Sequence, residues 1–187
     1  MRGQIRRSGS FILVLGLFAS LLLPTQSVAL SNFKVAPSTV WGYTYAGKAT
    51  GTTQTRPPKV AYLEQKSKFV VNFKNFPEWA KKDFQAAVDI WGANFASTVP
   101  ITIEASWGRS ASIGVLGSAR PGNYYSGFDG APDQSLWYPS ALANALGGKD
   151  LDPENPEMVI QVNSVANWNP RNDGAPRANE YDLQSVF

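Results

Sequence analysis

The sequence predicts an α+β fold, a mixed α/β layer in which a sheet carries a packing helix. Residues 101–107 alternate between apolar and polar side chains, which is the period of a strand with one buried face. Between Ala80 and Phe95, apolar residues recur at spacings of three and four, which places them on one stripe of a helix. Strand and helix signals follow one another along the chain, and this order favours a mixed layer over an all-β sandwich.

The first strand and the helix after it have clear signals. Residues 66–74 carry apolar side chains on both faces, so we expect a strand that is paired on both edges. Asn75 and Glu78 fit a capping box at the start of the helix, which we expect to run to about Ser97. Trp91 lies on the apolar stripe, and we expect it in the core.

The second half of the chain repeats these signals with shorter elements. A short helix is expected over residues 135–146, closed by Gly147 and Gly148. Asp182 is a candidate cap for a last helix, of which only one turn precedes the final residue, Phe187. Isolated helices of fewer than about 12–15 residues are marginal, so we expect the domain to be truncated here. Three more strands are expected, at residues 101–107, 112–119 and 158–162.

The amino terminus has the three-part layout of a secretory signal peptide. Three arginines precede an uncharged apolar run over 11–23, and small residues follow it up to Ala29. A bilayer-spanning helix needs about 20 apolar residues, so we expect cleavage after Ala29 and no stable membrane anchor; an uncleaved amino-terminal anchor is the alternative. The mature protein is then secreted, periplasmic or attached to the cell envelope.

The domain organisation follows from this cleavage. Residues 1–29 form the signal peptide, residues 30–58 form a leader or loose hairpin rich in Pro, Gly and Thr, and residues 59–187 form one domain. The chain has no Cys, so an exported fold without disulfides is expected, which suits a bacterial protein.

The charge balance argues against nucleic acid as a partner. The chain has 17 Lys and Arg against 14 Asp and Glu. Three of the basic residues lie in the signal peptide, which leaves 14 of each sign in the mature protein. No basic excess remains that could neutralise phosphates.

Five stretches of the chain together resemble one protein family. They are residues 84–91 (FQAAVDIW), 99–107, 115–119 (VLGSA), 137–146 (WYPSALANAL) and 150–153 (DLDP). The family they resemble is that of bacterial secreted zinc metallopeptidase-like proteins of the zincin type, and the likeness runs from about Val70 to Phe187. In that family a segment similar to residues 181–187 leads directly into a His-Glu-x-x-His helix.

The resemblance implies a partial zincin-like domain, a twisted mixed sheet with a packing helix that ends before the metal ligands. A full-length form would hydrolyse peptide bonds of a peptide or protein substrate. In that motif, two histidines on one helix face bind Zn²⁺ while the Glu takes a proton from the metal-bound water. This chain has no His and no Cys, so no residue of it is assigned as catalytic or as a metal ligand. We expect it to be inactive as it stands, and whether to class it as an enzyme stays open.

One loop holds a dense group of carboxylates. Alternating acidic residues in a loop can bind Ca²⁺ through oxygen ligands. The spacing departs from the calcium-loop pattern, because Asn155 stands at the glycine position and Gln161 at the final glutamate position. Calcium at the Asp150/Asp152 loop and a solvated loop are the two interpretations. The carboxylates are Asp150, Asp152, Glu154 and Glu157.

A cluster of aromatic residues in a loop-rich stretch supports an alternative function. These side chains either form a platform for a glycan or a protein, in a complete exported binding or scaffold domain, or they cap the core beneath a long loop. The oligomeric state is not indicated by the sequence. The aromatic residues are Tyr124, Tyr125, Phe128, Trp137 and Tyr138.

Overall fold

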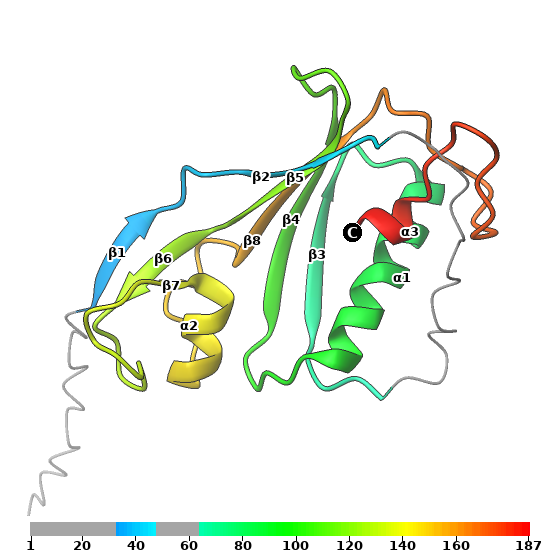
Figure 1. Ribbon diagram of the computed structural model, residues 1–187. Helices are drawn as coiled ribbons and strands as arrows, with labels where there is room; N and C mark the ends of the chain where they lie inside the picture. Colours follow the sequence, from blue (N-terminus) through cyan, green and yellow to red (C-terminus); the bar gives the residue numbers. More distant parts are fainter. Residues whose placement is uncertain (1–32, 48–63) are drawn as a thin grey trace, which may run out of the picture. The chain divides into compact units, whose positions relative to one another are not determined.

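A five-stranded mixed sheet in the order β2-β5-β8-β4-β3 forms the centre of the fold (Figure 1). The structure is a computed structural model, and it describes residues 33–47 and 64–187. The expected signal peptide and its cleavage position after Ala29 lie outside the described residues, as do residues 30–32 and 48–58 of the expected leader. The strands of the sheet are β2 (Gly42–Tyr45), β5 (Val115–Pro121), β8 (Met158–Asn163), β4 (Ile101–Gly108) and β3 (Phe69–Lys74).

The strand directions make the sheet mixed. β3, β4 and β8 run parallel, β5 runs antiparallel to β8, and β2 runs antiparallel to β5. The expected α+β fold is confirmed. The expectation that β3 is paired on both edges is wrong, because within the described residues it pairs with β4 alone. Only Phe69, Val71 and Phe73 pack against the core, while Val70 on the other face is exposed. Apolar residues on both faces of a strand therefore did not indicate how many of its edges are paired.

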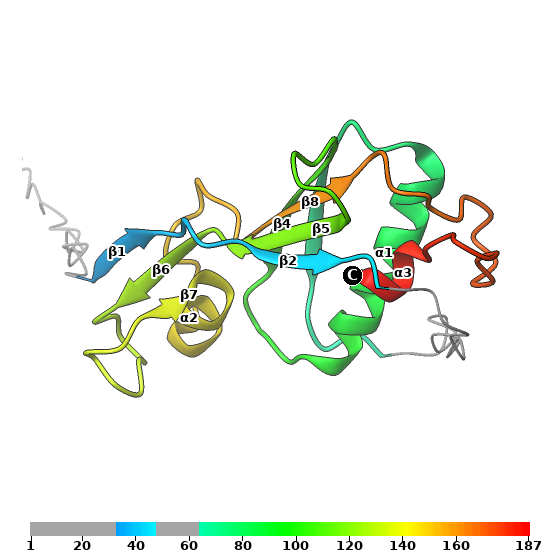
Figure 2. The same ribbon diagram turned by 45° about the horizontal axis from the view of Figure 1, so that its top comes forward.

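Helix α1 (Glu78–Asn94) packs against the sheet at β3 (Figures 1 and 2). The apolar stripe is confirmed, since Ala80, Phe84, Ala87 and Val88 are buried. The ring of Phe84 meets the rings of Phe73 and Phe76, each at a centroid distance of 5.6 Å. Edge-on ring pairs of this kind add to the stability that burial alone provides.

Both expected ends of this helix need correction. The capping box is wrong: Asn75 adopts a left-handed φ of 60°, and the N-cap is Pro77, without a side-chain cap. Asn tolerates that backbone region better than most residues, so here it turns the chain between β3 and α1. The carboxylate of Glu78 binds Lys81 instead of reaching back. The helix ends at Asn94, short of Ser97.

A smaller antiparallel sheet, in the order β1-β6-β7, stands beside α2. Helix α2 begins later than expected because Pro139 is its N-cap, and it is closed as expected by Gly147 and the C-cap Gly148, whose φ is 66°. Three buried residues, Tyr125, Phe128 and Ala143, form a second apolar cluster. The bounds are β1 (Lys34–Pro37), β6 (Asn123–Ser126), β7 (Tyr138–Pro139) and α2 (Ser140–Gly147).

The described part of the expected leader is not a loose hairpin. β1 pairs with β6 and β2 pairs with β5, so the two strands do not pair with each other. β1 and β2 run one after the other along the edge that β6 and β5 form (Figure 2).

The chain ends in helix α3 (Leu183–Val186), which packs against α1. The expected cap is confirmed, since the Asp182 carboxylate accepts hydrogen bonds from the backbone N–H and hydroxyl of Ser185. The loop before α3 is organised by Arg171, whose guanidinium binds the carboxylates of Glu180 and Asp173. Bidentate binding of this type fixes the loop geometry as well as adding energy.

Candidate functional site

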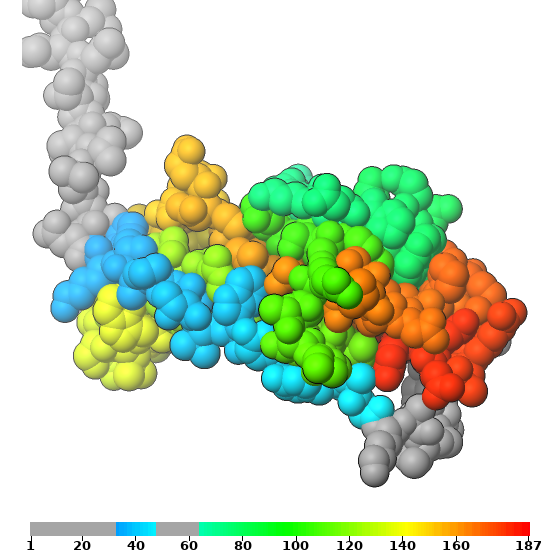
Figure 3. All heavy atoms as spheres, turned by 90° about the horizontal axis from the view of Figure 1, so that it is seen from above, coloured from blue at the N-terminus to red at the C-terminus, as the bar shows by residue number. Residues whose placement is uncertain are grey.

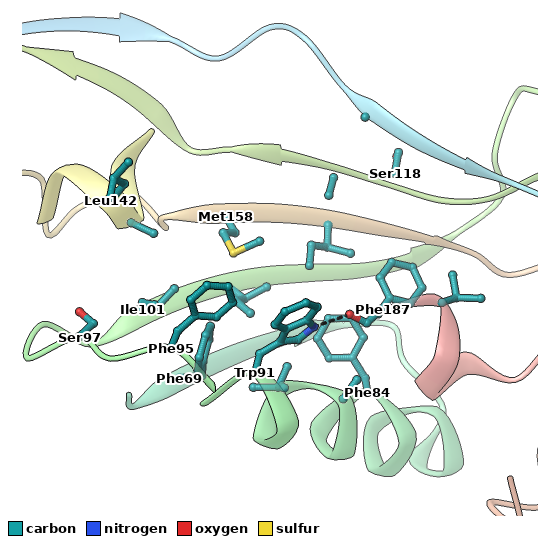
Figure 4. Close-up of a pocket in the computed structure, with 18 of the residues that line it drawn as sticks. Phe69, Phe84, Trp91, Phe95, Ser97, Ile101, Ser118, Leu142, Met158 and Phe187 are labelled. Atoms are coloured by element: carbon teal, nitrogen blue, oxygen red, sulfur yellow. Dashed lines mark hydrogen bonds between the residues drawn. The ribbon is translucent and has the colours of Figure 1, made fainter. Parts of the chain in front are cut away.

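An apolar groove of about 740 Å³ lies between α1, the open part of the sheet and α2 (Figure 4). Its floor is the sheet face beside α1, with Ile103 from β4, Ile160 from β8 and Ala119 from β5. Only a few of its lining residues carry polar side chains, among them Thr44, Ser97 and Ser118. A groove of this kind favours the binding of a large apolar surface, and it offers few polar groups that could orient a small polar substrate.

Three large apolar side chains stand half exposed around the groove. Trp91 and Phe95 stack on each other at the α1 side, with a centroid distance of 5.3 Å. Leu142 of α2 lines the opposite end (Figure 4). Their exposed fractions are 48%, 54% and 47%. Exposed apolar residues gathered along one groove are typical of an interaction site.

The expectation that Trp91 lies in the core is therefore wrong. Its indole N–H donates a hydrogen bond of 2.8 Å to the backbone carbonyl of Phe187, the last residue of the chain. The helical period identified the apolar face of α1 correctly. It could not show that the part of this face that carries Trp91 is left uncovered by the other described helices and strands. Trp91 links α1 to Phe187 in the groove.

Phe187 itself is held inside the groove by two further contacts. Its ring lies 5.6 Å from the ring of Phe84 and directly against the backbone of Gly117. Leu183, one turn earlier in α3, is fully buried in the main core. The last turn of the chain is thus anchored on α1 and β5 at one end of the groove.

The expected calcium loop forms a network of hydrogen bonds. A carboxylate oxygen of Asp152 accepts from the side-chain amides of Asn155 at 2.9 Å and Asn123 at 3.3 Å, and from the hydroxyl of Tyr125 at 3.2 Å. Burial raises the pKa of Tyr125 to about 12, with a further contribution from the charge of Asp152. The hydroxyl is therefore the donor in this contact at neutral pH.

The other carboxylates of this loop differ in burial. Glu157 is buried, and its two oxygens accept from the side chain of Asn144 and the backbone N–H of Thr102. Burial raises its pKa above the ordinary value, and Asp150 and Glu154 are exposed. Among residues 33–47 and 64–187, no group of three or more Asp, Glu, His or Cys is arranged to hold a metal ion.

The aromatic residues expected to form a platform are divided between core and surface. Tyr125 and Phe128 are buried, and the ring of Tyr138 packs edge-on against Phe128 at 5.4 Å. Tyr124 is half buried, and Trp137 is exposed. Most of the cluster therefore caps a core beneath the loop, which was one of the two interpretations of the sequence.

The groove was not predicted from the sequence. Its lining comes from strands, helices and loops that are distant in the chain, so no local pattern marks it. The one available signal was the expectation that an apolar stripe begins after Asp182, since such a stripe needs a surface to cover.

No helix in the described part of the chain combines the length and the apolar character that a membrane crossing requires. No protein-family model matches the chain, and neither a curated protein nor a solved structure does.

Proposed function

We propose that this chain is the scaffold part of an exported zinc-metallopeptidase-like domain and is inactive by itself. In this proposal the apolar groove seats a helix that continues α3 beyond Phe187 in a longer form of the protein. That helix would carry the His-Glu-x-x-His ligands, and the longer form would hydrolyse peptide bonds.

The observation that carries this proposal is the position of Phe187. α3 has a proper cap at Asp182 and one buried anchor at Leu183. The carbonyl of Phe187, which follows α3, accepts a hydrogen bond from the indole of Trp91 at one end of the groove. A helix placed there would cover apolar surface that otherwise stays in contact with water, at a gain of about 25 cal/mol per Å² buried.

The residues of this chain do not themselves fit a zinc site. The chain has no His and no Cys, and its buried carboxylate Glu157 is already satisfied by neutral donors. The proposal therefore assigns this chain a supporting role: Trp91, Phe84 and the sheet face position the helix, while the chemistry belongs to residues beyond Phe187.

The encoding DNA provides the first test. We expect a His-Glu-x-x-His series within a few dozen nucleotides after the codon of Phe187. The longer form should then hold zinc and cleave a peptide, and chelation or replacement of its first motif histidine by Ala should abolish cleavage. Absence of the motif in every frame would count against the proposal, as would stoichiometric zinc and peptide cleavage by a chain that ends at Phe187.

A second candidate is a complete exported binding domain that recognises a glycan or a protein. The adjacent, exposed side chains of Leu136 and Trp137 favour it, since exposed aromatics often serve as contact residues. Tyr125 and Phe128 are buried and give it no support. Cooperative unfolding of soluble residues 30–187, together with binding that Trp137→Ala abolishes, would favour this candidate over the scaffold.

A further inference from the structure

The N-terminal arm, defined as residues 33–47, lies along a single strand edge. β1 runs antiparallel to β6, from Lys34 opposite Ser126 to Pro37 opposite Asn123. β2 continues along β5, from Gly42 opposite Ala119 to Tyr45 opposite Val115. Only Gly122 separates β5 from β6. The arm thus covers one continuous edge, Val115–Ser126, which we call the β5–β6 edge.

The arm is held mainly by main-chain pairing. All four residues of β2 and three of the four in β1 are exposed. Figure 3 shows the arm, in blue and cyan, at the surface of the molecule. Two of its side chains make ring contacts with the edge: Phe33 meets Tyr125 at 5.6 Å, and Arg120 lies over the ring of Trp41 at 5.1 Å.

One side chain of the arm is poorly satisfied. Ser38 is buried, and its hydroxyl has no hydrogen-bond partner among the described residues. A buried polar group left without a partner costs about 1–3 kcal/mol. The short stretch between β1 and β2 therefore weakens the hold of the arm on the edge.

The buried residues of both core clusters lie outside the arm. All buried members of the main cluster lie between Phe76 and Leu183, and the arm adds only the partly buried Ala46. Phe33 is likewise a peripheral member of the second cluster. Loss of the arm would therefore leave both cores in place and expose the main-chain groups of the β5–β6 edge.

A bare strand edge pairs readily with another extended chain. The structure shows one segment that fits this edge, the arm itself, which pairs with it in a defined register and makes two ring contacts with it. Residues 48–63 join the arm to the body, and sixteen residues span at most about 53–58 Å when extended. That length permits the arm to reach an edge on another molecule.

We propose that the N-terminal arm is an exchangeable strand, and that the β5–β6 edge of one copy takes up the arm of a second copy of this chain. Exchange replaces each main-chain pair by an identical one, so it needs no new contact. Tyr43 and Thr44 line the apolar groove, so in an exchanged pair each groove is completed by the partner. The proposal is independent of any metal chemistry.

The absence of Cys makes a direct test possible. Tyr43 and Ser118 face each other in the antiparallel register, and directly opposed strand residues have a separation that suits a disulfide. One preparation carries Tyr43→Cys, and a second preparation with a distinguishable tag carries Ser118→Cys. The two are mixed over a range of concentrations under mild oxidation, and disulfide-linked heterodimers are counted on a non-reducing gel.

We expect heterodimer that increases with concentration. In the control, Val40→Cys replaces Tyr43→Cys, because Val40 is exposed and lies outside both strands. This control should give several-fold less heterodimer. The pair Ala36→Cys and Tyr124→Cys repeats the test between β1 and β6 at half-buried positions, in case Ser118→Cys disturbs the buried face of β5. Heterodimer no more abundant than the Val40→Cys control at both pairs would overturn the proposal.

Discussion

At Asp83, burial acts on a carboxyl group that has only one satisfied oxygen. Asn172 donates to one oxygen and also to the backbone carbonyl of Trp79, while the second oxygen has no partner among the described residues. Burial raises the pKa of Asp83, and the charges of Asp182 and Asp173 raise it further, against the lowering effect of the Asn172 hydrogen bond. The contact ties α1 to the loop that leads into α3.

This raised pKa predicts a pH dependence of stability. The folded state holds the Asp83 proton more tightly than the unfolded state, so stability falls as pH rises from the ordinary value through the raised folded pKa, and then levels off. Asp83→Asn cannot ionise, so we expect it to melt at a higher temperature than the wild type at pH 7. Thermal unfolding at several pH values checks this, and the difference should shrink towards acid pH. An equal difference at all pH values would contradict this explanation.

Gly122 is a second residue whose surroundings restrict substitution, because they leave no room for a Cβ atom. A Cβ added there would lie 1.8 Å from the backbone oxygen of Pro156, and the N–H of Gly122 itself donates to the carbonyl of Glu157. We expect Gly122→Ala to destabilise the fold by about 1–3 kcal/mol or more, the cost of overpacking. Gly108→Ala is the matched control, because its new Cβ would meet Gln161 at an ordinary 3.8 Å. Denaturant unfolding of both variants decides the point, and equal stabilities would refute it.

At the scale of elements, the helices were better predicted than the edge strands. The stripe of α1 was correct because burial against a sheet imposes a period of 3.6 residues on the sequence. β1 was missed, and β2 was expected only as part of a leader or loose hairpin, because their side chains are exposed and main-chain pairing leaves no alternation to detect. The capping box failed for a different reason, since Asn75 is used for its left-handed backbone and not for its side chain.

The hydrogen bond that joins α1 to the residue after α3 can be tested by a substitution of Trp91. Trp91→Phe keeps a ring next to Phe95 but removes the donor to the Phe187 carbonyl. We expect a loss of about 0.5–1.5 kcal/mol, the net value of one hydrogen bond. Faster amide exchange in residues 183–187, measured by mass spectrometry, should accompany it.

Trp137→Phe is the matched control, since Trp137 is comparably exposed and lies outside the groove lining. It should leave both stability and exchange in residues 183–187 unchanged. A similar effect of the two substitutions would mean that the indole donor of Trp91 does not hold the chain end.

For the whole molecule, the fold class could be predicted and the groove could not. Local periods specify which elements form, and their order favours a mixed layer. The groove depends on which part of the sheet face α1 leaves open, and this is set by the strand order β2-β5-β8-β4-β3. No single segment of the sequence encodes that order, so Ile160 and Ala119 could be recognised as strand residues but not as residues that line one groove with Trp91.

The central claim is that the apolar groove seats a further helix, and a single label tests it most directly. Because the chain lacks Cys, Leu142→Cys carries one environment-sensitive fluorophore at the groove, and Leu146→Cys on the same helix, outside the groove lining, is the control. The account predicts that the emission of the Leu142 label is blue-shifted in a form extended past Phe187 and matches that of a solvent-exposed label in the chain ending at Phe187. The emission of the Leu146 label should be the same in both forms. Identical emission from the Leu142 label in both forms would contradict it.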